Sequence, residues 1–219
     1  TIAACMTRAR AMGLTRLDTQ LLLAHQLKRE RAWLIAHDDE LFPESLREAF
    51  LADCAKRADG VPLAYLLGER EFFGLMLQVS PDVLVPRPET EGLVEWALEV
   101  CASEKPCRVL DLGTGSGAIA LALKHARPDW WQAVAGEERF DLIISNPPYV
   151  AGADPHLPAL RHEPRQALTP EGDGLAALRV IVAKAGEHLL PGAWLLLEHG
   201  FDQANAVSHM LQAAGFEGL

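Results

Sequence analysis

The stretch RVLDLGTGSGAIALAL, residues 108–123, decides the fold class of this chain. Its first five residues are β-prone and apolar apart from Asp111 and Arg108, and they predict a short strand. A loop with glycine at every second position follows, and glycine allows positive φ angles, so a ligand can press against the backbone N–H groups there. From Ala118 the pattern predicts a helix. The order of strand, glycine loop and helix favours an α/β fold.

The same alternation continues toward the C-terminus. Residues 140–145, FDLIIS, predict a buried strand, and residues 175–189 predict a helix. A turn at Pro191-Gly192, a strand over 193–198 and a helix over 202–214 are expected next. Strands that alternate with helices predict a mostly parallel, doubly wound sheet.

The N-terminal part has a different pattern. Residues 1–58 predict a small bundle of three or four helices. Residues 65–79 contain glycine breaks and partial apolar alternation, which predict a hairpin, and an amphipathic helix is expected over 89–101. We therefore expect a helical domain over 1–60, a hairpin and linker over 61–88, and the sheet domain over 89–219.

One connection is too short for such a sheet. Only residues 127–139 join the helix after the glycine loop to the strand at 140, where a doubly wound half normally has a strand, a helix and a further strand. Either the protein is truly abbreviated or a segment is missing near residues 127–131. We favour the missing segment, because without it the sheet lacks its central neighbours.

Composition excludes several classes of protein. The 219 residues are 49% hydrophobic and 23% charged, which is ordinary for a globular protein. A net charge of −10 disfavours tight non-specific nucleic-acid binding. The four cysteines show no zinc spacing, so we expect no metal site and buried or idle thiols in a reducing cytoplasm. No apolar run approaches the roughly 20 residues of a membrane helix.

The tetrapeptide Asn146-Pro147-Pro148-Tyr149 directly follows the predicted strand at 140–145. Two prolines continue neither a sheet ladder nor a helix interior, so a stiff exposed turn is expected. This turn offers an amide, carbonyl acceptors and an aromatic ring. That set suits a planar amide or amino nitrogen as substrate, although a tight loop closed by a packed Tyr is the simpler alternative.

The glycine loop indicates a nucleoside cofactor. Residues 111–117 match neither the Gly-x-Gly-x-x-Gly of dinucleotide folds nor a Walker loop. The carboxylate of Asp111 at the end of the strand repels a pyrophosphate but suits a cofactor that carries positive charge. S-adenosylmethionine, with its sulfonium and ammonium groups, is such a cofactor.

Asp-x-Gly-x-Gly-x-Gly followed by Asn-Pro-Pro-Tyr resembles the Rossmann-like class I S-adenosylmethionine-dependent methyltransferases that act on nitrogen. The helical N-terminal part, Pro86-Arg87-Pro88-Glu89-Thr90-Glu91 and Leu196-Leu197-Glu198-His199-Gly200 resemble the HemK/PrmC family. This resemblance covers essentially the whole chain. It implies an enzyme that methylates the side-chain amide N5 of a glutamine in class-1 peptide-chain release factors and releases S-adenosylhomocysteine.

The resemblance also implies which residues form the site. The cofactor contacts are expected from Asp111, Gly113, Thr114, Gly115, Ser116, Gly117, Trp130 and Asn146. Trp130 is preferred to Trp131 as the residue that flanks the adenine, and no acidic residue for the ribose hydroxyls is found. Asn146 and Pro147 are expected to accept the two N–H groups of the substrate amide through side-chain and backbone oxygens, while Pro148 and Tyr149 form a wall against its plane.

Several polar residues keep two interpretations. Arg87, Glu89 and Glu91 either cap a helix or line the pocket. His199 lies at the functional edge of the sheet, but a structural His is the stronger alternative. The loop that holds His156, Arg161, His162 and Arg165 either contacts the protein substrate or is a solvated connection.

The expected partner is a release factor, docked on the helical N-terminal domain by an acidic surface. We expect a monomer with no membrane contact and no direct nucleic-acid contact. The main alternative is an N6-adenine or N4-cytosine methyltransferase that acts on a flipped base, but no basic groove or target-recognition domain is found. A third alternative is a cofactor-binding scaffold without activity.

Overall fold

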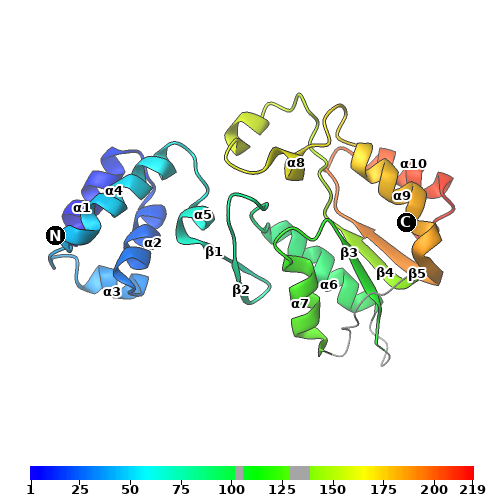
Figure 1. Cartoon of the computed structure of the whole chain (residues 1–219), viewed down its shortest axis with the longest axis horizontal. Helices are drawn as coiled ribbons and strands as arrows, with labels where there is room; N and C mark the ends of the chain where they lie inside the picture. The colour runs from blue at the N-terminus through cyan, green and yellow to red at the C-terminus, as the bar shows by residue number, and fades with distance from the viewer. Residues whose placement is uncertain (102–105, 129–138) are drawn as a thin grey trace. The chain divides into compact units, whose positions relative to one another are not determined.

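The computed structural model describes residues 1–101, 106–128 and 139–219, which form two compact units, Thr1–Glu69 and Arg70–Leu219 (Figure 1). Each unit has a hydrophobic core of its own. None of the helices in these described ranges is long and apolar enough to cross a membrane.

The first unit, in which every residue is described, consists of five helices: α1 (Ile2–Ala11), α2 (Arg16–Leu27), α3 (Arg31–Ala36), α4 (Glu44–Ala58) and α5 (Leu63–Leu67). The hydroxyls of Thr1 and Thr15 cap α1 and α2 by accepting the N–H groups of Ala4 and Asp18. Leu22, Leu23, Leu34 and Phe50 are fully buried between the helices. The predicted helical bundle is confirmed.

The hairpin is shorter than predicted. It pairs β1 (Glu69–Phe72) with β2 (Leu75–Gln78), whereas residues 65–67 of the predicted hairpin region belong to α5. Gly68 ends α5 in the left-handed conformation, with φ at 76°. Phe73 and Gly74 connect the strands, and both have positive φ, as a two-residue hairpin turn requires.

Three parallel strands form the sheet in the described part of the second unit. They are β3 (Val109–Leu112), β4 (Phe140–Ser145) and β5 (Leu189–Leu197), in the order β3-β4-β5. β5 runs through Pro191-Gly192, which were predicted to be a turn before the strand. The pairing of β4 with β5 is irregular between Phe140 and Leu142, and this irregularity accommodates the proline and glycine.

Helices cover both faces of this sheet, as the doubly wound pattern predicts. In Figure 1, α6 (Glu91–Val100) and α7 (Ala118–Ala126) lie on one side, and α9 (Ala176–His188) and α10 (Ala204–Ala213) on the other. Leu142 and Ile144 of β4 pack in the core that includes α6 and α7, whereas Ile143 packs with Ala185 of α9. The three consecutive apolar residues at the centre of β4, Leu142 to Ile144, fit a strand that is buried on both faces.

Short helices and one disulfide complete the unit. The short helices are η1 (Pro88–Thr90), η3 (Leu157–Leu160) and α8 (Arg165–Leu168). Cys101 at the end of α6 is joined to Cys107 just before β3. Both cysteines are buried, as expected, but the expectation of free thiols is wrong for this pair, while Cys5 and Cys54 are free.

Candidate active site

The carboxyl ends of the three strands bring the predicted motifs to one edge of the sheet. Leu112 of β3 pairs with Ser145 of β4, and Ser145 pairs with Leu197 of β5. The residues that follow these three positions are Gly113, Asn146 and Glu198, so they emerge side by side. Open α/β sheets bind their ligands at this edge.

The tetrapeptide is held rigidly at the end of β4. Pro147 is buried, and the Tyr149 carbonyl accepts a hydrogen bond from Gln203 Nε2 at 2.9 Å. Gly174 lies against the same carbonyl: a Cβ at this position would be 2.3 Å from the Tyr149 oxygen, so no larger residue fits. The predicted stiff turn is thus fixed by segments far apart in the sequence.

A chain of hydrogen bonds links Asn146 to Tyr149. Asn146 Nδ2 donates to Thr90 Oγ1 at 2.9 Å, and Thr90 Oγ1 donates to Glu198 Oε2 at 2.7 Å. The Tyr149 hydroxyl donates to the other oxygen of Glu198 at 3.0 Å. Burial, together with the charge of Glu198, raises the pKa of Tyr149 to about 12, so this phenol stays neutral near pH 7. Among the described residues, Asn146 Oδ1 has no protein donor.

The glycine loop has the backbone that its sequence predicts. Gly113, Gly115 and Gly117 all have positive φ, between 54° and 80°. A hydrogen bond of 2.8 Å from Gly117 N to Thr114 O closes the loop, and Gly117 then starts α7. The loop is exposed at Gly113 to Gly115, so its backbone N–H groups are accessible to a ligand.

Asp111 lies in β3, two residues before this loop, as a largely buried anion with few donors. Neither carboxylate oxygen has a hydrogen bond of good geometry in the described structure, and only the Thr114 side chain and the Ala120 N–H lie close enough to favour the charged form. Burial raises the pKa of Asp111 above the usual 3.8. A buried carboxylate with few donors is unfavourable unless a ligand supplies positive charge or N–H groups. A cationic cofactor therefore fits this position.

A cavity joins the glycine loop to Asn146. Its lining comes from the hairpin, the proline-rich segment, the loop and the tetrapeptide: Phe72, Leu84, Pro86, Arg87, Thr90, Gly113, Thr114, Gly115, Ser116, Ala118, Ile119 and Asn146. The structure thus brings together the loop residues and Asn146, which the sequence predicted to act at one site.

Three of the polar residues with two interpretations, Arg87, Glu91 and His199, have structural partners. Glu91 Oε1 accepts the backbone N–H of Phe73 and so anchors the hairpin turn. His199 Nδ1 lies 2.8 Å from the Gly200 carbonyl, which favours the structural interpretation. Arg87 both lines the cavity and forms an ion pair of 2.6 Å with Glu163.

Glu163 is the buried anchor of the loop after the tetrapeptide. Its side chain is 3% exposed, and its second oxygen accepts the backbone N–H of Val85 at 3.2 Å. Replacing Glu163 by Ala will lower the free energy of unfolding by about 3 kcal/mol, because Arg87 and the Val85 N–H lose their acceptor. Urea denaturation measures this loss.

The matched control is Glu171→Ala. Glu171 pairs with Arg165 at 2.7 Å, but both side chains are more than half exposed, so its replacement will cost far less stability than that of Glu163. Equal losses for the two variants would contradict the anchoring role of Glu163.

In the same loop, the His156 ring nitrogen Nδ1 is hydrogen-bonded to Asp154.

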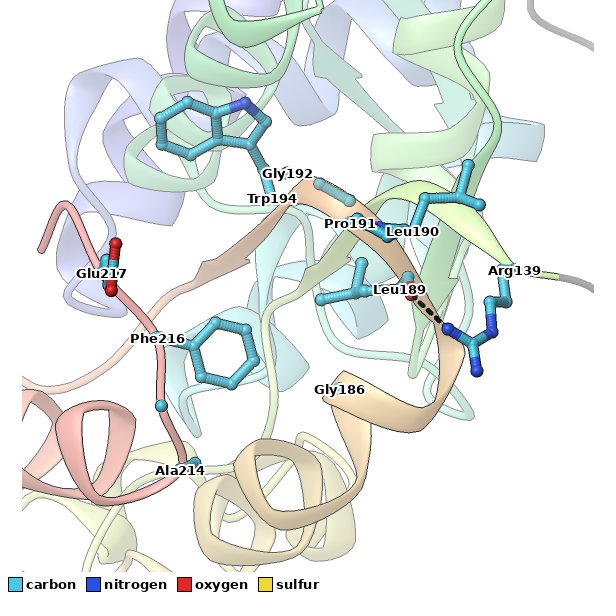
Figure 2. Close-up of a pocket in the computed structure, with 12 residues that line it drawn as sticks. Arg139, Gly186, Leu189, Leu190, Pro191, Gly192, Trp194, Ala214, Phe216 and Glu217 are labelled. Carbon is cyan, nitrogen blue, oxygen red and sulfur yellow. Dashed lines mark hydrogen bonds between the residues drawn. The ribbon is translucent and has the colours of Figure 1, made fainter.

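A second cavity lies away from these motifs, at the amino ends of β4 and β5 (Figure 2). Leu189, Trp194 and Phe216 line it, and Arg139 donates to the Leu189 carbonyl at 3.5 Å. None of the predicted site residues lines this cavity.

Some predictions lie beyond these observations or need correction. Trp130 and Trp131, expected at the adenine, lie outside the described residues. Residues 1–69 carry nine Lys and Arg against ten Asp and Glu, so the first unit is nearly neutral and the prediction that this domain is acidic is wrong. Residues 70–219 carry eleven against twenty and hold the acidic excess.

Sequence reasoning missed the two residues that connect Asn146 to Tyr149. Thr90 and Glu198 stood inside the quoted motifs, but neither was predicted as a site residue. The position of Glu198 directly after a parallel strand was the available signal. Gln203 and Gly174, which fix the Tyr149 carbonyl, had no comparable local signal.

Comparison with known proteins places these features in a wider context. Residues 3–68 match the family model described as the PrmC N-terminal domain. A release factor glutamine methyltransferase of Burkholderia pseudomallei is 46% identical over 94% of this chain and 87% of its own length. Proteins of the same name from Coxiella burnetii and Bordetella pertussis are 40% and 44% identical, over 92% and 93% of this chain and 84% and 88% of their own lengths. The Burkholderia match spans 249 residues, more than the 219 of this chain, so that relative has residues inside the match that this chain lacks.

Proposed function

The chain belongs to the release factor glutamine methyltransferase family, and we propose that it transfers a methyl group from S-adenosylmethionine to the side-chain amide N5 of a glutamine in class-1 release factors. The observation that carries this proposal is the orientation of Asn146. Its Nδ2 is bonded to Thr90, so its Oδ1 is the atom left to accept an N–H group of a substrate amide. Asn146 and the glycine loop line the same cavity.

The residues at the loop fit the proposed cofactor. Gly113, Thr114, Gly115, Ser116 and Gly117 would surround it. The exposed backbone N–H groups of Gly113 to Gly115 would donate to it, and the buried carboxylate of Asp111 would face its positive charge. Trp130 is proposed to flank the adenine. When bound, the cofactor supplies a methyl group made electrophilic by the sulfonium.

The tetrapeptide would position the substrate. Asn146 Oδ1 and the Pro147 carbonyl accept the two N–H groups of the glutamine amide and so fix the direction of its nitrogen. Pro148 and Tyr149 support the plane of the amide. An amide nitrogen is a weak nucleophile, and positioning of this kind contributes roughly 7–11 kcal/mol. We assign no general base, because the proton can leave to solvent after the transfer.

The first unit is proposed to dock the release factor. Since this unit is nearly neutral, the acidic excess of residues 70–219 is the charge that would complement a basic partner. We further propose a monomer that acts in the cytoplasm. Family membership does not favour the N6-adenine or N4-cytosine alternative.

A labelling experiment tests the proposed reaction. The protein is incubated with methyl-labelled S-adenosylmethionine and with a class-1 release factor, the same factor with its target Gln replaced by Ala, a DNA duplex or an RNA duplex. We expect label on the unmodified release factor alone. Label on nucleic acid would support the base methyltransferase, and label on no substrate would support the scaffold.

A further inference from the structure

We infer that Glu198, acting through Thr90, sets which way the Asn146 amide faces, and that these two side chains are positioning residues for the transfer. This inference rests on the proposed function. The two residues come from distant segments: Thr90 ends η1 after the proline-rich stretch, and Glu198 directly follows β5. The hydrogen bond from Asn146 to Thr90 is 2.9 Å long and the one from Thr90 to Glu198 is 2.7 Å long, and both belong to the chain of hydrogen bonds described above.

The carboxylate of Glu198 decides which group donates at each step of this chain of hydrogen bonds. An ionised Glu only accepts hydrogen bonds, and Tyr149 donates to one of its oxygens. The Thr90 hydroxyl has a single hydrogen, which it donates to the other oxygen. Thr90 Oγ1 therefore meets Asn146 with a lone pair, and the NH₂ group of Asn146 must face it. The orientation of an Asn amide is assigned from such partners, and here they leave one choice.

The surroundings of Thr90 leave its hydroxyl bonded, within the described ranges of the chain, only to Asn146 and Glu198. It stands at the N-terminal cap of α6, where a Thr side chain commonly accepts a helix N–H group, yet its hydroxyl makes no such bond. Thr90 is 5% exposed, which keeps water from replacing either partner. A buried hydroxyl bonded on both sides holds its partners more firmly than an exposed one.

The orientation matters because the reverse one opposes the substrate. If the Asn146 amide turned over, its NH₂ group would face the N–H groups of the glutamine amide, donor against donor. Losing the lone pair at position 90 will therefore lower the transfer rate even when the fold and the cofactor contacts remain.

Replacement of Thr90 by Val or Ser separates orientation from packing. Thr90→Val keeps the shape and removes the hydroxyl, whereas Thr90→Ser keeps the hydroxyl. Glu198→Gln keeps the shape but adds N–H donors. The Thr90 hydroxyl is then no longer forced to donate toward residue 198. Thr169→Val is the matched control, because Thr169 is also buried, at 4% exposed, and accepts a hydrogen bond from Glu171 N.

The composition of the chain allows a direct readout of the amide. Asn146 and Asn205 are the only two asparagines, so protein labelled with ¹⁵N at the asparagine side chains gives two NH₂ signals by NMR. Asn205 is exposed on α10 and serves as the internal reference. We expect slow hydrogen exchange at the Asn146 NH₂ group in the wild type, Thr90→Ser and Thr169→Val, and exchange at least 10-fold faster in Thr90→Val.

Kinetics complete the test. Thr90→Val will lower kcat for release-factor methylation about 100-fold and Glu198→Gln about 10-fold, with cofactor affinity close to wild type and a Tm lowered by a few degrees. Thr90→Ser and Thr169→Val will stay within about threefold. If Thr90→Val matches Thr90→Ser in both exchange and kcat, the inference is overturned while the proposed function stands. A wild type that methylates no release factor overturns the proposed function, and the exchange data then still decide the orientation.

Discussion

Replacing Asn146 by Ala will lower kcat for release-factor methylation by roughly 10²- to 10³-fold, the range seen when one preorganised hydrogen-bonding group is removed from an active site. Asn146 Oδ1 is free to accept a substrate N–H group, and Ala offers no acceptor. The affinity for S-adenosylmethionine will change at most a few-fold, since the glycine loop and Asp111 remain. Single-turnover kinetics with labelled cofactor, and calorimetry for its binding, measure the two effects separately.

Asn205→Ala is the control for this variant. It removes the other asparagine of the chain, on the exposed side of α10, and should leave kcat unchanged. Thr90 loses a donor in Asn146→Ala but keeps Glu198 as acceptor, so the Tm will fall by only a few degrees. Turnover of Asn146→Ala within a few-fold of wild type would show that the role given to this residue is wrong.

The motifs were predictable because their structure is local. The strand over 109–112, the glycine loop and the stiff turn at 146–149 each follow from φ preferences and apolar runs within a few neighbouring residues. Pairing of Leu112, Ser145 and Leu197 then brings them to one edge, as a parallel sheet must.

The hydrogen bond from Thr90 to Glu198 was not predictable from local sequence patterns. The two residues are separated by 108 positions, and their contact depends on where η1 ends relative to β5. The same holds for Glu163, whose bond to Val85 spans 78 positions. No local pattern signals which buried carboxylate finds which donor, so these residues come from tertiary structure alone.

The three-stranded sheet indicates that the connection between α7 and β4 is unusually short. Among the described residues, β3 has β4 as its only sheet neighbour, and the sequence between the two contains the short stretch 127–139. The Burkholderia match extends over more residues than this chain has. Both observations support our proposal that a segment is missing near residues 127–131.

The second large effect is expected at Asp111. Replacing Asp111 by Asn will weaken binding of S-adenosylmethionine about 10- to 100-fold, because an interaction with a charged group contributes roughly 1.5–3 kcal/mol and Asn cannot neutralise the cofactor's charge. At the same time, the variant will be more stable than the wild type without cofactor, by about 1 kcal/mol, since it removes a buried charge that has no hydrogen bond of good geometry in the described parts of the chain. Opposite changes in affinity and stability are the signature of a residue that serves binding and not folding.

The pH dependence has a defined sign. Burial raises the pKa of Asp111 in the free protein, so the folded state binds this proton more tightly than the unfolded state. The stability linked to this proton is fully present at pH values below the pKa of Asp111 in the unfolded state. It is lost as the pH rises through the pKa of Asp111 in the folded state. The gain in stability from Asp111→Asn therefore appears at pH values above the folded-state pKa. Cofactor binding favours the ionised form. Its affinity will therefore fall as the pH is lowered, beginning above the ordinary Asp pKa of 3.8.

Asp173→Asn is the matched control for both measurements. Asp173 is exposed, and its hydrogen bond with Arg179 lowers its pKa to about 2, the opposite direction from Asp111. We expect Asp173→Asn to leave cofactor affinity unchanged and to show no gain in stability. Calorimetric titration across the acid range should give a pH-dependent affinity for the wild type and Asp173→Asn, and a flat one for Asp111→Asn. An affinity for Asp111→Asn that equals the wild type at neutral pH would exclude Asp111 from the cofactor site, because the loss of its charge would then have no effect on a cationic ligand.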